Sequence, residues 1–329
     1  MIKTIKDVHD LKNKRVLVRV DFNVPIKSGK VLENYRIQKV LPTIEYLLKN
    51  KAKVILVSHL GRPTAGKFEK KFSLLPVAKE LEKILKRKIN FCKLEKYQES
   101  KNITLLENIR FYKGEQENSK KFAKELACLA DIFVMDGFAV AHREAASVSG
   151  VAKFLSSYAG LLVAEEVNGL TQVINKPKKP LVLILGGVKC ETKIPVLENL
   201  LPKSNQILLG GGMVNTYLWA KGFKVGGSLV DKEYKNRILK ICKNKKVILP
   251  VDLVVGDYKA KNYKVVKIDK NFIVKKDQAI LSVGPETVQN YARYIRKAKT
   301  LILNGALGYF EQPPYNYATY AINRLFAAI

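Results

Sequence analysis

The chain of 329 residues is short of several residue types that mark common functional sites. Its four cysteines lie far apart and form no Cys-x-x-Cys pair, so we predict neither a zinc site nor a disulfide framework, and a reducing compartment fits. The three histidines lack the spacing of metal ligands, and no Gly-x-Ser-x-Gly motif indicates a serine hydrolase. No apolar run approaches the roughly 18 residues of a membrane span.

Acidic residues are scarce as well, with 29 Asp and Glu against 59 Lys and Arg, which gives a net charge of +30. Only 11 of the basic residues are arginines, and the lysines are scattered over helix-like stretches. This pattern favours a solvated, lysine-rich surface over a nucleic-acid site. The first residues lack the apolar core and small-residue cleavage site of a secretory signal, so we expect a cytoplasmic protein without a membrane partner.

Short apolar runs rich in β-branched residues alternate with amphipathic segments along the whole chain. Continuous apolar runs are typical of strands buried on both faces of a parallel sheet, so the pattern predicts an α/β, doubly wound fold. We expect strands at 15–20, 54–57, 103–106, 132–135, 181–185, 206–209, 247–249, 279–283 and 300–303. We expect helices at 36–49, 74–85, 119–129, 195–200, 234–243 and 286–297.

The length predicts two domains, because one core of ordinary size does not extend over 329 residues. Residues 150–169 read as a helical connection without a strand of its own, and a Pro-rich polar stretch follows at 175–180. We therefore predict an N-terminal domain at 1–160, an interdomain helix and linker at 161–177, and a C-terminal domain at 178–329.

The residues that follow the expected strands differ between the two halves. Ligands of open parallel sheets bind beyond the carboxyl ends of the strands. In the first half these ends carry Arg or His, and guanidinium forks match phosphate and carboxylate oxygens. We predict a pocket for a compact polyanion, built from Arg19, Asp21, Asn23, Arg36, His59, Arg62, Arg110 and Arg143. The alternative is that each arginine forms a surface salt bridge at its own strand end.

In the second half, four of five strand ends carry glycine. Glycines at such turns let backbone N–H groups approach phosphates at a helix N-terminus. Gly186-Gly187-Val-Lys189 is followed by Lys193, and lysines at i and i+4 would share one face of a helix. These ends predict a nucleotide site, and the alternative at each glycine is tight packing of strand against helix.

At these residues the chain resembles the phosphoglycerate kinase family. The matching motifs, in family order, are Arg19-Val-Asp-Phe-Asn-Val-Pro25, Ser58-His-Leu-Gly-Arg-Pro63, Glu107-Asn-Ile-Arg-Phe111, Ala141-His-Arg143, Gly186-Gly-Val-Lys189, Gly210-Gly-Gly-Met213, Pro250-Val-Asp252 and Asn304-Gly305. The resemblance implies two Rossmann-like domains with parallel sheets, joined by a hinge helix. It also implies reversible transfer of the acyl phosphate of 1,3-bisphosphoglycerate to Mg-ADP in glycolysis, which gives 3-phosphoglycerate and ATP.

Carried over by position, the resemblance implies roles for individual residues. Arg36 and Lys189 would stabilise the transferring phosphoryl group, and Glu166 would lie at the hinge. The 3-phosphoglycerate site would comprise Asp21, Asn23, Arg36, His59, Arg62, Arg110 and Arg143. The nucleotide site would comprise Gly186, Gly187, Lys193, Gly211, Gly212, Asn304 and Glu311. The family further implies a monomer, Mg²⁺ bound with ADP or ATP, and no nucleic-acid partner.

The chain also departs from the family pattern. Ser282 stands where the family has Asp, and Ala306 replaces a proline. The sequence ends at Ile329, before the family's Gly-Gly-Gly-Asp-Thr turn, whose Asp binds the nucleotide's magnesium. We therefore expect an incomplete C-terminal domain with no metal ligand of its own. The alternative hypothesis is a truncated or catalytically impaired member that acts as a binding protein for 3-phosphoglycerate or nucleic acid.

Overall fold

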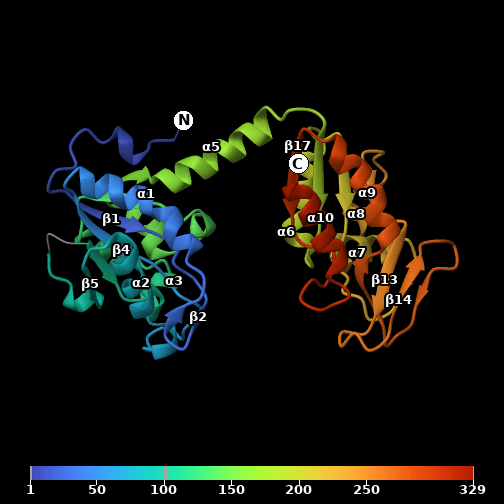
Figure 1. The fold of residues 1–329 in the computed structure, drawn as a ribbon, viewed down its shortest axis with the longest axis horizontal. Coiled ribbons are helices and arrows are strands. Elements are labelled where there is room, and N and C mark those ends of the chain that lie inside the picture. Colours follow the sequence, from blue (N-terminus) through green and yellow to red (C-terminus); the bar gives the residue numbers. More distant parts are fainter. Residues whose placement is uncertain (1, 100–102, 329) are drawn as a thin grey trace. The chain divides into compact units, whose positions relative to one another are not determined.

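A computed structural model describes residues 2–99 and 103–328 of the chain (Figure 1). The chain folds into two compact units, which divide between Leu170 and Thr171. Unit 1 denotes residues 1–170 and unit 2 denotes residues 171–329. Each unit contains a parallel sheet with helices on its faces, which confirms the predicted α/β, doubly wound class.

Unit 1 contains a six-stranded parallel sheet in the order β5-β6-β4-β1-β7-β8. The strands are β1 (Arg15–Arg19), β4 (Lys53–Val57), β5 (Ile89–Cys92), β6 (Ile103–Leu106), β7 (Ile132–Met135) and β8 (Ser156–Ala159). A two-residue hairpin of β2 (Ile26–Lys27) and β3 (Lys30–Val31) lies apart from this sheet. The carboxyl ends of β6, β4, β1 and β7 are therefore neighbours at one edge.

Helices cover both faces of this sheet because successive side chains of a strand point to opposite faces. Val16 and Val18 of β1 join a core with residues of α1 (Tyr35–Lys49) and α2 (Leu75–Leu85), whereas Leu17 joins a second core with residues of α4 (Lys120–Ala127). The remaining helices of the unit are the short α3 (Lys113–Gln116) and α5 (Leu161–Asn175).

The prediction that residues 150–169 form a helical connection without a strand is wrong. Residues 156–159 form β8, which pairs with β7, and α5 begins only at Leu161. The criterion of a continuous apolar run does not predict this strand, because Ser156 and Ser157 interrupt the run. Both serines are exposed because β8 lies at the edge of the sheet. The other edge strand, β5, was not predicted either, and three of its four residues are half-buried.

Unit 2 contains a four-stranded parallel sheet in the order β12-β10-β9-β17. Its strands are β9 (Leu181–Leu185), β10 (Gln206–Leu209), β12 (Val247–Ile248) and β17 (Thr300–Asn304). Strands β11 (Lys224–Val225) and β15 (Ile273–Val274) form a separate parallel pair. The helices are α6 (Cys190–Leu200), α7 (Gly212–Ala220), α8 (Lys235–Cys242), α9 (Pro285–Lys297) and α10 (Tyr317–Ala327).

A three-stranded antiparallel sheet completes unit 2, in the order β14-β13-β16 (Figure 1). Its strands are β13 (Asp252–Gly256), β14 (Tyr263–Lys267) and β16 (Ala279–Val283). The segment 279–283 is thus a strand, as expected, but its assignment to a parallel sheet is wrong. All five of its residues are buried, and burial on both faces gives the same apolar run whatever the strand direction.

None of the helices within residues 2–99 and 103–328 is long and apolar enough to cross a membrane.

Candidate functional site

A cluster of basic and polar side chains lies at the carboxyl ends of the central strands of unit 1. Arg19, the last residue of β1, is almost fully buried. Its Nε donates to Ser147 Oγ at 2.9 Å, and its Nη2 lies 3.3 Å from Nδ1 of His59, which follows β4. Burial lowers the pKa of Arg19, and the charges of Glu115 and Asp21 oppose that shift. Arg19 is therefore a buried support for the cluster, in contact with Ser147 and His59.

His59 is uncharged in this environment. The residue is 3% exposed, and burial lowers its pKa to about 2, assisted by the positive charges of Arg19, Arg110 and Arg143. Its Nδ1 lies 3.9 Å from Asp21 Oδ1. Arg36 lowers the pKa of His59 as well, so four of the predicted arginines lie near enough to His59 to act on its charge. A neutral imidazole has one donor and one acceptor nitrogen, and since Nδ1 faces the Nη2 donor of Arg19, Nε2–H is the donor that remains for a ligand.

The loop after β4 is held by two other members of the predicted set. Asn23 Oδ1 accepts a hydrogen bond from Gly61 N at 2.9 Å, and Arg110 Nη1 donates to Gly61 O at 2.6 Å. Burial lowers the pKa of Arg110, and the nearby charges of Arg143 and Arg62 lower it further. Arg62 and Arg143 are themselves exposed, so both leave cationic groups free toward solvent.

Arg36 enters the same edge from the first turn of α1 and forms a salt bridge with Asp21. Its side chain is 46% exposed. Among the described residues, Arg36 is the one predicted site arginine paired with a carboxylate. Within the described residues, the other predicted arginines thus lack the separate surface salt bridges of the alternative, and the shared anion pocket stays a prediction.

The glycines of unit 2 interlock three loops at the carboxyl ends of β9, β10 and β17. Gly186 N donates to Asn304 O at 3.1 Å, Gly187 N to Ala306 O at 2.6 Å, and Gly212 N to Gly187 O at 2.8 Å. A Cβ atom on Gly186 would lie 2.0 Å from Ala306 O, and one on Gly212 would lie 1.9 Å from Val188 O. These glycines are thus packed tightly, but against the backbones of neighbouring loops and not, as the alternative had it, between strand and helix.

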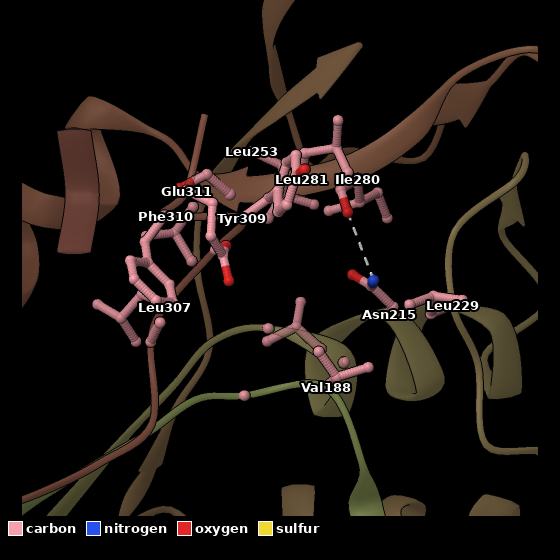
Figure 2. Close-up of a pocket in the computed structure, with 18 of the residues that line it drawn as sticks. Val188, Asn215, Leu229, Leu253, Ile280, Leu281, Leu307, Tyr309, Phe310 and Glu311 are labelled. Atoms are coloured by element: carbon pink, nitrogen blue, oxygen red, sulfur yellow. Dashed lines mark hydrogen bonds between the residues drawn. The ribbon is translucent and has the colours of Figure 1, made fainter. Parts of the chain in front are cut away.

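These loops form one side of a cavity of about 380 Å³ (Figure 2). The cavity contains four residues of the predicted nucleotide site: Gly187, Gly211, Gly212 and Glu311. Its other walls are mainly apolar: Val188, Leu229, Leu253, Ile280, Leu281, Leu307 and Phe310. Figure 2 shows the carboxylate of Glu311 and the side-chain oxygen of Asn215 directed toward the middle of the cavity. An apolar slot with a few polar groups is typical of a small-molecule site.

The two lysines predicted to act on phosphate groups, Lys189 and Lys193, do not lie as predicted. Lys189 has extended backbone angles and precedes α6, which begins at Cys190, so the prediction that Lys189 and Lys193 share a helical face is wrong. The amide of Cys190 donates to Asp231, which starts the helix one residue after the lysine. Lys193 Nζ donates to Asn304 Oδ1, so these two predicted nucleotide residues touch each other beside the cavity. Lys189 is exposed.

Sequence reasoning missed the residues that support the basic cluster. Glu115 is buried, and its carboxylate accepts from Ser147 Oγ at 2.6 Å and from Ser147 N at 2.9 Å. Ser147 in turn accepts from Arg19. No local signal could reveal this chain of contacts, because Ser147 lies 128 residues from Arg19. It also missed Asn215, and it noted Ser282 only as a departure from the family pattern. The Oδ1 atom of Asn215 and the Oγ atom of Ser282 are buried against the cavity without a partner in the described part of the chain.

The described residues contain no group of three or more His, Cys, Asp and Glu that could hold a metal ion.

Comparison with known proteins assigns the family. The family model described as phosphoglycerate kinase matches residues 5–329. The phosphoglycerate kinase of Francisella philomiragia is 43% identical over 328 residues, which cover 97% of this chain and 83% of that protein. That of Coxiella burnetii is 44% identical over 324 residues, covering 95% and 82%.

Solved structures agree with this assignment. The structure of phosphoglycerate kinase from Coxiella burnetii superposes with a TM-score of 0.82 at 40% identity, covering all of this chain and 86% of that one. The enzyme from Pyrococcus horikoshii gives a TM-score of 0.81 at 28% identity, covering 99% and 86%. This chain belongs to the phosphoglycerate kinase family.

Proposed function

We propose that this chain catalyses the reversible transfer of a phosphoryl group from 1,3-bisphosphoglycerate to Mg-ADP, giving 3-phosphoglycerate and ATP in glycolysis. The observation that carries the proposal is a pair of unlike sites, an arginine-rich cluster in unit 1 and an apolar cavity closed by glycine loops in unit 2. Family membership favours this kinase over a non-catalytic protein that binds 3-phosphoglycerate or nucleic acid.

The cluster in unit 1 suits a small acid that carries both a phosphate and a carboxylate. Arg62, Arg110 and Arg143 supply the guanidinium groups, and the neutral His59 supplies a hydrogen bond without adding charge. Asp21 holds Arg36, and Asn23 fixes the loop that carries Arg62. We assign the acidic substrate to Asp21, Asn23, Arg36, His59, Arg62, Arg110 and Arg143.

The cavity in unit 2 suits a nucleotide. The apolar walls would take the base, and Glu311 would bond the ribose hydroxyls. Gly186, Gly187, Gly211 and Gly212 have no side chains and would let the phosphates approach the loop backbone, with Asn304 and Lys193 beside them. The described residues offer no metal cluster of their own, so we expect Mg²⁺ to arrive as part of the nucleotide substrate, held by its phosphates.

Phosphoryl transfer depends mainly on positioning and on stabilising charge. We assign this task to Arg36, which is half-exposed at the edge of unit 1, and to Lys189, which is exposed beside the cavity loops of unit 2. The two substrate sites belong to different units, so they must approach each other during turnover, which would also exclude water. We propose residues 161–177 as the interdomain connection, and we expect a cytoplasmic monomer without membrane or nucleic-acid partners.

A coupled assay of ATP formation from 1,3-bisphosphoglycerate and ADP tests the proposal. Lys189→Ala should lower turnover by about 100-fold, the usual effect of removing one group that stabilises developing charge. Lys203→Ala is the matched control, because Lys203 is an exposed lysine just beyond the other end of α6. Turnover of the unsubstituted chain no higher than that of Lys189→Ala would refute the kinase activity.

A further inference from the structure

Asp136 is a fully buried carboxylate. It belongs to none of the matching motifs, and the proposed reaction assigns it no role. It follows β7 directly, and its exposed fraction is 0%. Its Oδ1 accepts hydrogen bonds from Leu162 N at 3.1 Å and Val163 N at 3.2 Å, in the first turn of α5. Thr43 of α1 lies near enough to the carboxylate to lower its pKa. Asp136 therefore ties the first turn of α5 to the end of the central sheet.

The first turn is also the part of α5 that is buried. Val163 and Ala164 are its buried residues, and the side chains from Glu165 to Asn175 are exposed or half-buried. Leu161 N donates to Thr43 Oγ1 at 2.9 Å, which adds a second tie in the same turn. The helix continues beyond Leu170, where unit 1 ends. The direction in which α5 leaves unit 1 is thus fixed by a few bonds at its start.

The same arrangement in unit 2 shows what is unusual about Asp136. Asp252 caps α9, and both its oxygens are used: Oδ1 accepts from Thr287 N at 2.7 Å and Oδ2 from Glu286 N at 3.0 Å. In both cases a glycine before the helix lies against the carboxylate, Gly160 for Asp136 and Gly284 for Asp252. Asp136, however, has a buried Oδ2 without a partner in the described part of the chain. A buried unpaired oxygen is costly for stability, and such features often accompany function.

Asp136 also adjoins the proposed substrate site. It lines a cavity of about 200 Å³ whose charged and titratable members are Asp21 after β1, Tyr35, Arg36 and Lys39 of α1, and Glu165 and Glu166 of α5. Asp136 and Arg36 thus line the same cavity, together with residues of the helix that leads out of unit 1.

We propose that Asp136 is a positioning residue whose ionised carboxylate anchors the first turn of α5 beside Arg36, and so sets the direction in which this helix leaves unit 1. The inference rests on the proposed function, since α5 begins in unit 1, which would hold the acidic substrate, and runs into unit 2, which would hold the nucleotide. Burial raises the pKa of Asp136 to about 6, against the opposing effects of Thr43 and of the hydrogen bonds from Val163 and Leu162. Protonation removes the negative charge that favours the N-terminal end of the helix.

Steady-state kinetics of the full chain with Asp136→Asn test this role, because Asn has the same shape without the charge. We expect kcat to fall ten- to a hundredfold, the range for misplaced reacting groups, with both KM values changed less than twofold. The wild-type kcat should decline as pH falls through about 6, and this acid limb should be absent in Asp136→Asn. Asp131→Asn, at the opposite end of β7, is the matched control with wild-type kcat. An unchanged kcat in Asp136→Asn, or a retained acid limb, would overturn the proposal.

Hydrogen exchange gives a readout that does not depend on activity. The protection factors of the Leu162 and Val163 amides should be about fivefold lower in Asp136→Ala than in the wild type at pH 7.5, the usual size of an N-cap effect. They should be unchanged in the control Asp131→Asn. Equal protection in Asp136→Ala and the wild type refutes the anchoring role. Loss of protection without any measurable turnover supports the anchor and refutes the proposed reaction instead.

Discussion

Replacing Asp136 with Asn should stabilise the protein at neutral pH, although it removes hydrogen-bonded charge. The pKa of Asp136 rises from an ordinary 3.8 to about 6 in the folded protein, chiefly because of burial. The folded state therefore holds the proton more tightly than the unfolded state does. Below pH 3.8 this preference contributes its full amount to stability, and the contribution is lost as pH rises through 6.

The size of the effect follows from the two pKa values. At about 1.4 kcal/mol for each pKa unit, a rise from 3.8 to about 6 corresponds to about 3 kcal/mol of unfolding free energy. Of this, about 2 kcal/mol is lost between pH 4.5 and 7.5. Asn does not titrate, so the stability of Asp136→Asn relative to the wild type should increase by that amount over the same interval.

Urea unfolding of both proteins at several pH values measures this difference, followed by a signal that reports on unit 1. Asp131→Asn is the control, since the pKa of Asp131 is lowered, chiefly by the hydrogen bond from Arg15. Asp131 contributes stability above its ordinary pKa and loses it only as the solution becomes more acid, so this variant should show a loss that is constant from pH 4.5 to 7.5. A constant difference for Asp136→Asn as well would refute the reasoning.

Three further substitutions test the proposed sites. Arg36→Ala should lower kcat about 100-fold while ADP affinity, measured by calorimetry, changes less than twofold, since Arg36 belongs to unit 1; equal effects on both would count against its role. Gly211→Ala should abolish ADP binding and lower the melting temperature, because the new Cβ would lie 2.4 Å from Gly187 O. Gly222→Ala is its control: φ is also positive, but no atom lies within 4 Å, so only about 1–2 kcal/mol of backbone cost is expected. Glu311→Ala should weaken ADP about tenfold and leave 2′,3′-dideoxy-ADP unaffected; equal weakening of both would exclude a ribose contact.

Most strands that the sequence predicts are buried on both faces. Strands β1, β4, β7 and β9 contain continuous apolar runs, and each was expected within a residue of its observed bounds. Strands β5, β8 and β14 were not expected, because half-buried or exposed residues interrupt their patterns. Strand β13 was not expected either, although all five of its residues are buried, because its apolar run is only three residues long between Asp252 and Gly256. The apolar pattern also does not predict whether a strand runs parallel or antiparallel to its neighbours. Strand β16 is fully buried in an antiparallel sheet, and its sequence has the apolar run expected of a parallel strand.

The candidate site also contains residues that the sequence predicts and residues that it does not. The rule that ligands meet the carboxyl ends of parallel strands predicts which arginines converge, and His59 lies among them. The residues that hold these side chains in place come from distant segments, as Ser147 does for Arg19, and have no motif. The start of α6 was misplaced because Asp231, far along the chain, fixes its first amide.

The interlocked glycine loops of unit 2 have a consequence for how tightly a nucleotide can be held. Their amides and carbonyls are bonded to one another, so the three loops are fixed as one rigid body before any ligand enters. A ligand that uses such a surface loses little conformational entropy on binding, because the protein has no loops left to order. The same rigidity limits variation, because a side chain on Gly186, Gly211 or Gly212 would separate two loops at once, and adaptation of base preference is left to wall residues such as Asn215 and Ser282.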